Sequence, residues 1–271
     1  MPRHAALLGA LLLGLTPTAS ADPPAHAALG GFARQQLRHP RVAEAARDRL
    51  AAVEADFREA AAAWPPRGVF IRGFKTEGQV ELWAAPAARS ASEWVLVRTF
   101  PVCAASGELG PKRQVGDLQV PEGFYHVSVF NPRSDFHLSL GVSYPNAADR
   151  FHSAGRAPGY AIMVHGNCVT IGCLPLQDGP IEDLYLAAVM ARDNGQTTIP
   201  IHLFPCRLDE PACAATLAAA GAERPDLHDF WAGLRPGYEA FTATKVPPVV
   251  RANRDGTYTL IPDKKKPRSA S

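Results

Sequence analysis

The spacing of apolar residues changes along the chain and separates helical from strand-forming parts. Between residues 42 and 64, apolar side chains recur every three or four positions with arginine and glutamate between them. This spacing predicts an amphipathic helix, which Pro65-Pro66 would end. Beyond it, short β-branched or aromatic runs between turn residues predict strands at 69–71, 80–83, 94–97 and 125–130.

The second half of the chain mixes both kinds of pattern. Further strands are predicted at residues 160–164 and 198–204, and further helices at 180–194, 210–220 and 227–234. The first of these helices is the best delimited, because Pro180 suits a first turn and Gly195 follows the last one. The patterns together predict an α+β fold, in which a strand-rich centre lies between an N-terminal helix and a C-terminal helical extension.

The first 21 residues have the three parts of a secretory signal peptide. Arg3 precedes an apolar run at residues 5–15, and Ala19-Ser20-Ala21 offers the small residues of a cleavage site. The run is too short to span a bilayer, and no other segment has transmembrane length. We therefore expect an exported, periplasmic protein without a stable membrane span.

Length and composition predict one large domain with additions at both ends. Hydrophobic residues make up 46% of the 271 residues, which is enough for a substantial core. The expected organisation is a signal peptide at 1–21, a helical segment at 22–64, a strand-rich main domain at 65–205, a C-terminal extension packed on it at 206–262 and a disordered tail at 263–271. The net charge of +2 is too small to indicate a nucleic-acid-binding protein.

The five cysteines are an odd number, so an oxidising compartment should leave at least one thiol unpaired. Cys206 and Cys213 flank a short polar segment with a turn-forming proline, which predicts a local disulfide; two reduced, partly buried thiols are the alternative. The sequence leaves the roles of Cys103 and Cys168 open.

The stretch from residue 165 to residue 173, HGNCVTIGC, combines the groups that acyl transfer needs. Cys173 is the candidate nucleophile, and His165 could lower its pKa and shuttle its proton. Gly172 would let a substrate carbonyl approach backbone N–H groups, while Thr170 could brace the turn by a local hydrogen bond. The region of Gly166 would orient the imidazole.

Two other interpretations of this stretch remain open on the sequence alone. His165, Cys168 and Cys173 could bind zinc, with His202 as a fourth ligand. Alternatively, Cys168 and Cys173 could be core or disulfide-bonded residues. A glycine-rich segment at 106–123 is expected to be an ordered loop beside a cleft, with a plain hairpin connection as the alternative.

The order of His-Gly and Thr-Ile-Gly-Cys resembles the signature of the YkuD-type L,D-transpeptidase domain, and most closely its YafK-like branch. Further stretches that resemble this branch are Leu109-Gly110-Pro111-Lys112, Gly116-Asp117, Pro121-Glu122-Gly123-Phe124-Tyr125, Ser143-Tyr144-Pro145-Asn146, Asp149-Arg150 and Lys245-Val246-Pro247-Pro248. Two positions depart from the broader family: Ile171 stands where most members have histidine, and Thr170 replaces the commoner serine.

The resemblance implies an exported cysteine enzyme that acts on peptidoglycan stem peptides without a cofactor. A peptidoglycan-lipoprotein amidase using the same cysteine and histidine is one alternative, and a non-catalytic wall-binding module is another. Arg150 is a candidate partner for substrate carboxylates, and Tyr144 and Asn146 could line the cleft. Each also has an ordinary interpretation, as a surface ion pair, a packed ring and a turn residue. The other histidines, at positions 126, 137, 152 and 202, are expected in strands or loops.

Overall fold

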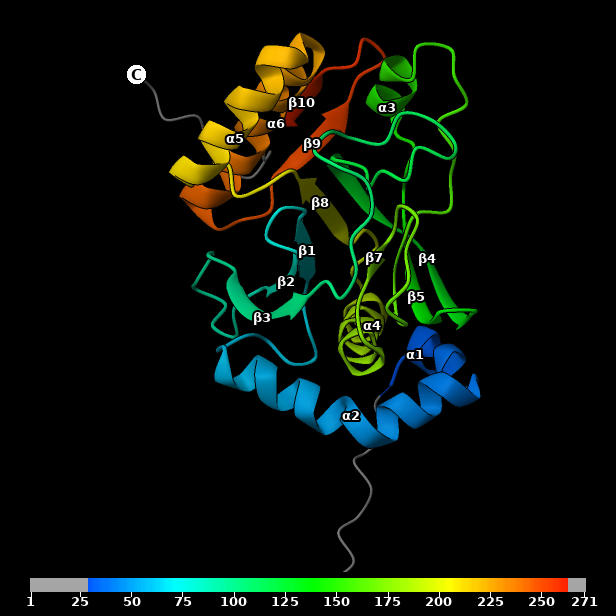
Figure 1. Ribbon diagram of the computed structural model, residues 1–271. Helices are drawn as coiled ribbons and strands as arrows, with labels where there is room; N and C mark the ends of the chain where they lie inside the picture. Colours follow the sequence, from blue (N-terminus) through cyan, green and yellow to red (C-terminus); the bar gives the residue numbers. More distant parts are fainter. Residues whose placement is uncertain (1–28, 263–271) are drawn as a thin grey trace, which may run out of the picture.

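The computed structural model describes residues 29–262; the predicted signal peptide and the predicted tail lie outside the described residues. Figure 1 shows a strand-rich centre with helices packed around it. The helices are α1 (Gly31–Gln36), α2 (Pro40–Glu59), α3 (Ala147–His152), α4 (Asp178–Asp193), α5 (Pro211–Glu223) and α6 (Pro225–Thr244). The strands are β1 (Val69–Phe74), β2 (Gln79–Ala84), β3 (Val95–Pro101), β4 (Gly123–Ser134), β5 (His137–Val142), β6 (Met163–His165), β7 (Leu174–Pro175), β8 (Pro200–Phe204), β9 (Val249–Ala252) and β10 (Tyr258–Ile261). The predicted α+β class is confirmed.

Eight of the described strands form one mixed sheet in the order β3-β2-β1-β8-β4-β5-β6-β7. The pairs β1–β8 and β6–β7 are parallel and the other neighbours are antiparallel. The strands β9 and β10 form a separate antiparallel hairpin beside α6. The short strands β6 and β7 therefore lie at one edge of the sheet, where the residues between them can form an accessible turn.

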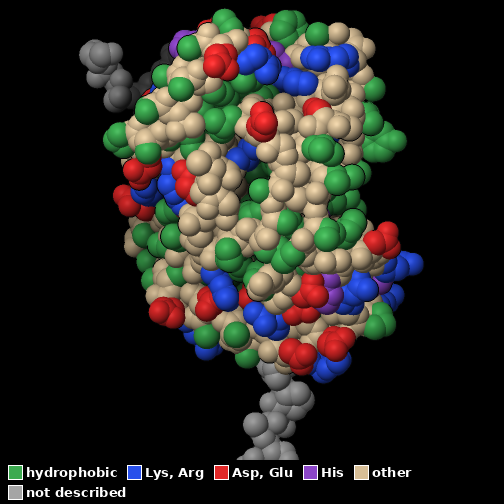
Figure 2. Space-filling view, in the orientation of Figure 1, with side chains coloured by type: hydrophobic (Ala, Val, Ile, Leu, Met, Phe, Trp, Pro, Cys, Tyr) green, Lys and Arg blue, Asp and Glu red, His purple; other side chains and the backbone are tan. Residues whose placement is uncertain are grey.

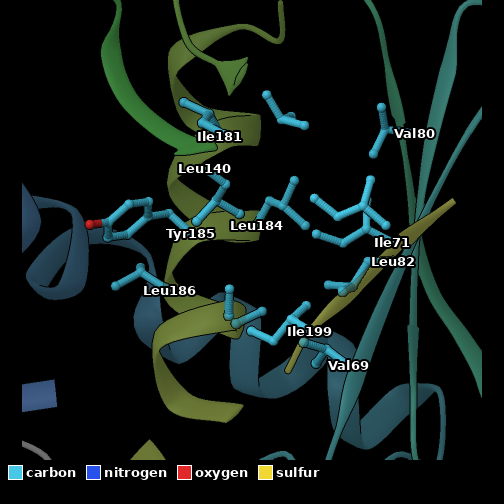
Figure 3. Packing of buried hydrophobic residues seen from close by; sticks show 14 of the residues in the cluster. Val69, Ile71, Val80, Leu82, Leu140, Ile181, Leu184, Tyr185, Leu186 and Ile199 are labelled. Atoms are coloured by element: carbon cyan, nitrogen blue, oxygen red, sulfur yellow. The ribbon is translucent and has the colours of Figure 1, made fainter. Parts of the chain in front are cut away.

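One face of the sheet is covered by α4, which is buried along most of its length. In Figure 3, Leu184 of α4 points toward Ile71 and Leu82 of the two neighbouring strands β1 and β2, whereas Ile181 lies on the side of Leu140 in β5. The long helix α2 packs on α4 in turn, as Figure 1 shows at the bottom of the view. Burial of this apolar surface stabilises the sheet and fixes the position of its edge strands.

The opposite face of the sheet is covered by the C-terminal helices. Successive side chains of β1 point to opposite faces of the sheet. Val69 and Ile71 face α4, whereas the ring of Phe70 packs 5.0 Å from the ring of Phe241 in α6. Residues of α5 and α6 form a second apolar cluster with Phe74, Phe124 and Phe204 of the sheet. The extension is thus part of the folded body and not a separate appendage.

Several predicted boundaries differ from the structure, and three of these differences have a clear physical cause. Helix α2 ends at Glu59, earlier than predicted, because Ala61 adopts a left-handed conformation with φ 55°. The strand predicted at 160–164 is limited to β6, since Ala161 has φ 64° and Tyr160 is 82% exposed. Helix α6 continues through Pro236 and well past residue 234, because its buried apolar face continues to Phe241.

The C-terminal extension also contains an unpredicted feature, the β9–β10 hairpin. Its turn residue Gly256 has φ 85°, a conformation that favours glycine. None of the helices within residues 29–262 is both long enough and apolar enough to cross a membrane.

Candidate active site

Parallel pairing of β6 and β7 brings the two ends of the 165–173 stretch together. Val164 lies opposite Leu174, and His165 lies opposite Pro175. Cys173 immediately precedes β7, so this pairing brings it to the same edge of the sheet as His165. The segment between them thus forms a loop that begins with the imidazole and ends with the thiol.

Cys173 is the one free thiol among the described residues, and it is partly exposed. Its sulfur lies 3.7 Å from the carbonyl oxygen of Ala161, at the edge of the sheet. Burial raises the pKa of the Cys173 thiol, while the backbone N–H of Met163 and the charge of Lys112 act to lower it. The sulfur is therefore accessible, but the structure favours its protonated form at neutral pH.

The His165 ring is held by a hydrogen bond within its own turn. Its Nδ1 lies 2.6 Å from the carbonyl oxygen of Gly166. Because a carbonyl can only accept, Nδ1 carries the proton and Nε2 keeps a free lone pair. The ring of Phe136 packs 4.8 Å away, and His165 is only 1% exposed. Burial lowers the pKa of His165, against the opposing effect of Gly166, so the imidazole is neutral at pH 7 and can act as a base.

The backbone at position 166 leaves no room for a side chain. A Cβ placed on Gly166 would lie 2.7 Å from a carboxylate oxygen of Asp178 and 3.0 Å from a methyl carbon of Ile181. The same Asp178 carboxylate accepts a hydrogen bond from the backbone N–H of Asn167 at 2.9 Å. Glycine at this position allows the chain to pass close to the start of α4, which fixes the carbonyl that orients His165.

Thr170 braces the turn that carries the nucleophile. Its hydroxyl oxygen accepts hydrogen bonds from the backbone N–H groups of Gly172, at 3.2 Å, and Cys173, at 2.9 Å, and lies 2.9 Å from the Cys173 carbonyl oxygen, to which it can donate. From the sequence we expected backbone N–H groups beside Gly172 to bind an oxyanion. In the structure, the N–H groups of Gly172 and Cys173 donate to the Thr170 hydroxyl oxygen instead. An oxyanion would have to replace the threonine hydroxyl as their acceptor.

Replacing Thr170 by valine should test the importance of this brace. Valine keeps the branched shape but leaves two backbone donors without their acceptor, so turnover should fall by about tenfold or more. Thr170→Ser keeps the hydroxyl and should retain activity close to that of the unmodified protein. Steady-state rates of the two variants give the comparison, and equal rates would show that the hydroxyl is dispensable.

The other four cysteines are paired. Cys206 bonds to Cys213, as the sequence predicted, and Cys103 bonds to Cys168, 65 residues apart in the sequence. The second bond ties the catalytic loop to the chain that leaves β3. The backbone N–H of Cys103 also donates to the Pro175 carbonyl at 3.1 Å. The loop is thus attached to the sheet near both of its ends.

The disulfide also removes Cys168 from any zinc site. His202, the other suggested ligand, is buried between the rings of Phe70 and Phe124, at 4.6 Å and 4.8 Å. Burial, with the charge of Arg72, lowers the pKa of His202 to about 3. No group of three or more metal-ligating side chains occurs within residues 29–262. His202 is therefore a buried residue of the core, packed between aromatic rings.

A buried ion pair lies in the glycine-rich loop near the thiol. Lys112 is almost fully buried, and its ammonium group donates to Asp117 at 2.7 Å. Burial raises the pKa of Asp117, but Lys112 and three backbone N–H groups outweigh it, and the net pKa is lowered. Both residues lie in stretches that carry the family resemblance, although the sequence alone assigned no role to them.

The pH dependence of alkylation should report the raised pKa of Cys173. Iodoacetamide reacts with the thiolate, and raising the pKa delays the appearance of this form as the pH increases. The modification rate at Cys173 should therefore keep rising between pH 7 and pH 9. Peptide mapping after timed quenching provides the measurement. A rate already at its plateau at pH 7 would indicate a preformed thiolate–imidazolium pair and contradict the electrostatics described here.

A hollow of about 240 Å³ opens beside the nucleophile. Its walls come from the end of β1, the glycine-rich loop and the catalytic turn, and its lining residues include Phe74, Val102, Ala105, Leu109, Val120, Cys173 and Leu174. In Figure 2, the middle of the face over these loops carries few charged side chains, while charges gather near the helices at the bottom. The predicted loop at 106–123 thus borders a cleft, as expected.

Lys75 fixes the loop that forms one wall of this hollow. Its ammonium group donates to the carbonyl oxygens of Glu108 and Gly110, at 2.9 Å and 2.7 Å, and to a carboxylate oxygen of Glu122 at 3.0 Å. The other carboxylate oxygen of Glu122 accepts from the indole N–H of Trp231, in α6, at 2.7 Å. The C-terminal extension therefore helps to hold the wall of the cleft.

The structure gives internal partners to two of the three residues suggested as substrate contacts. The Tyr144 hydroxyl donates to the Pro158 carbonyl at 2.9 Å, and Asn146 caps α3 by accepting from the N–H of Asp149. Arg150 lies on the exposed side of α3. None of the three lines the hollow beside Cys173.

Comparisons with known proteins match the chain to curated relatives from two strains of one species. No protein-family model matches the chain. The chain is 32% identical over 187 residues to "Putative L,D-transpeptidase YafK" of Escherichia coli (strain K12), covering 67% of this chain and 70% of that protein, and the match in Escherichia coli O157:H7 has the same values.

Solved structures also match parts of the chain, among them the following two. The helical cell shape determining protein Pgp2 of Campylobacter jejuni has a TM-score of 0.40 and 14% identity, covering 68% of this chain and 72% of that one. L,D-transpeptidase 1 of Mycobacterium tuberculosis has a TM-score of 0.29 and 14% identity, covering 50% of this chain and 61% of that one.

Proposed function

Because the chain belongs to the L,D-transpeptidase family, in the branch of YafK, we propose that it is an acyl-transfer enzyme that acts on peptidoglycan stem peptides through a thioester on Cys173. The observation that carries this proposal is the state of the five cysteines. Four are paired, and the one free thiol is partly exposed at the edge of a hollow. It directly precedes β7, which pairs with the strand that ends at His165.

The first half of the reaction forms the acyl-enzyme. Nε2 of His165 takes the thiol proton of Cys173 as the sulfur attacks the carbonyl on the L-centre of diaminopimelate. The carbonyl oxygen becomes an oxyanion and replaces the Thr170 hydroxyl as acceptor for the N–H groups of Gly172 and Cys173. The carbon–nitrogen bond then breaks, and the departing D-alanine takes the proton from His165. The product of this half is a thioester on Cys173.

The second half releases the acyl group. An amine of the acceptor attacks the thioester carbonyl and gives its proton to His165. The carbon–sulfur bond breaks, and the thiolate of Cys173 recovers that proton. Attack by water follows the same route and gives hydrolysis. Which acceptor reacts depends on the group that the cleft holds near the thioester.

We also propose that the protein works in the periplasm. The predicted signal peptide supports export, and two disulfides support an oxidising compartment. In this arrangement residues 65–205 form the catalytic domain, and residues 206–262 support the wall of its cleft through Trp231.

A product assay with defined muropeptides tests the proposed function. The mature protein is incubated with a tetrapeptide donor, with and without an amine-bearing acceptor peptide, and products are identified by mass. Release of D-alanine with a cross-linked product supports transpeptidation, and release of D-alanine alone supports hydrolysis. A lysine-linked peptide as donor tests the amidase activity. Binding of all these peptides without any turnover would leave a wall-binding module and refute the enzymatic proposal.

A further inference from the structure

A second cavity lies on the other side of the glycine-rich loop. It encloses about 430 Å³ between this loop, the C-terminal end of α3 and the junction of α5 and α6. Its lining includes three arginines, Arg113, Arg156 and Arg224, together with His152. Figure 2 shows blue side chains gathered at the top of the view, where α3 and the α5–α6 junction lie. The lining therefore carries three arginines against two carboxylates, Asp117 and Asp226.

Two of these arginines have no carboxylate partner. Arg224 makes two 3.1 Å hydrogen bonds to Asp226, so its charge is compensated locally. Neither Arg113 nor Arg156 forms an ion pair within the part of the chain that the structure describes. The Nη1 atom of Arg113 is buried without a hydrogen-bond partner, and its guanidinium packs 4.5 Å from the centre of the Phe230 ring. A guanidinium with no carboxylate in direct contact can still pair with the carboxylate of a ligand.

The carboxylates nearest to Arg113 are already engaged. Asp149 accepts hydrogen bonds from the backbone N–H of Asn146 and the hydroxyl of Tyr125, at 2.9 Å and 3.0 Å. Asp117, which also lines the cavity, pairs with Lys112 at 2.7 Å. Neither carboxylate makes a direct ion pair with Arg113 or Arg156, so N–H groups of the two arginines remain available to a ligand.

The cavity is close to the catalytic turn. Gln119 lines the cavity, and its carbonyl oxygen would lie 3.0 Å from a Cβ placed on Gly172, the neighbour of the nucleophile. Leu109 lines both this cavity and the hollow beside Cys173. A peptide whose carbonyl lies at Cys173 can therefore extend across the glycine-rich loop into the cavity.

We propose that this arginine cavity binds a free carboxylate of the peptide substrate, with Arg156 at the rim making the direct contact and Arg113 at the floor supplying positive potential. The inference rests on the proposed function, because it concerns a second contact for the same peptide. Arginine suits this role since its planar guanidinium can bind a carboxylate through two parallel hydrogen bonds. The cavity would hold the peptide in register without contacting the reacting bond.

Kinetics of Arg156→Gln and Arg113→Gln with a tetrapeptide donor test the proposal. Each variant should raise KM for the free-carboxylate peptide by about tenfold while kcat stays within about twofold. The same peptide with its carboxylates amidated one at a time identifies the group involved. The peptide in which the recognised carboxylate is amidated should bind with the same weak affinity to the unmodified protein and to both arginine variants. Arg47→Gln, an exposed arginine of α2 that lines neither cavity, is the matched control.

Three outcomes would overturn the cavity as a carboxylate site. These are an unchanged KM in Arg156→Gln, an equal rise in KM for every amidated peptide, and inorganic phosphate binding as tightly as the peptide.

The rate of Cys173 alkylation at pH 9 is the control for folding. It should be the same in each variant as in the unmodified protein, which shows that the site is folded. Calorimetric binding to Cys173→Ala separates the two proposals. Binding that depends on Arg156 without any turnover by the unmodified protein would retain the cavity and refute the enzymatic function.

Discussion

Cys173→Ala should abolish every turnover of peptide substrates, lowering the rate by at least about a thousandfold. Both release of D-alanine and transfer to an acceptor require the thioester, so no branch of the reaction survives without the sulfur. Peptide binding should be retained, because the hollow and the arginine cavity do not depend on this atom. Rates measured by mass spectrometry of muropeptide products provide the test.

The paired variant Cys206→Ala/Cys213→Ala is the control for loss of a cysteine elsewhere. This pair joins residues only 7 apart in the sequence, in the C-terminal extension. The double variant should lose thermal stability and keep most of its turnover, because the catalytic loop retains its own disulfide. Turnover by Cys173→Ala would contradict the proposed nucleophile, whatever the behaviour of the control.

His165→Gln should lower kcat by about 10² to 10⁴-fold, the usual contribution of a general acid–base. Glutamine is similar in size and can still donate to the Gly166 carbonyl, so the turn should persist while proton transfer is lost. The rate of Cys173 alkylation at pH 9 should change much less than kcat, because hydroxide can take the thiol proton there in place of His165.

The pH profile distinguishes a catalytic imidazole from a structural one. Burial lowers the pKa of His165, so its neutral form persists below the ordinary value of about 6.5. The activity of the unmodified protein should therefore decline with acid only below that pH, and the variant should lack this decline. His126→Gln, which changes an exposed histidine of β4, should leave the profile as it is. An unchanged profile in His165→Gln would refute its role as base.

The periodicity of the sequence predicted the fold where local patterns decide the structure. Residues 69–71 and 198–204 read as strands because β-branched and aromatic residues alternate there, and both contribute to the sheet. Residues 160–164 have an equally apolar pattern, but Ala161 and Tyr160 lie in a turn that presents the Ala161 carbonyl to the thiol. A pattern of apolar residues cannot reveal such a turn, because tertiary contacts impose it.

The candidate site could be located from one short stretch, but its internal contacts could not. The 165–173 stretch connects β6, which ends at His165, to β7, which begins just after Cys173. Neither the Cys103–Cys168 bond nor the Lys75–Glu122 pair is visible in the sequence, because each joins segments that only the folded sheet brings together. The sequence also led us to expect a lowered pKa for the Cys173 thiol. In the structure this pKa is raised, because the effect of burial outweighs that of the neighbouring groups.

The most direct test is the intact mass of the protein shortly after mixing with a tetrapeptide donor. The account predicts an adduct equal to the donor minus D-alanine, located on Cys173 by peptide mapping and sensitive to hydroxylamine, and absent from Cys173→Ala. Product formation with no such adduct, or with the adduct on another residue, would contradict a thioester at Cys173.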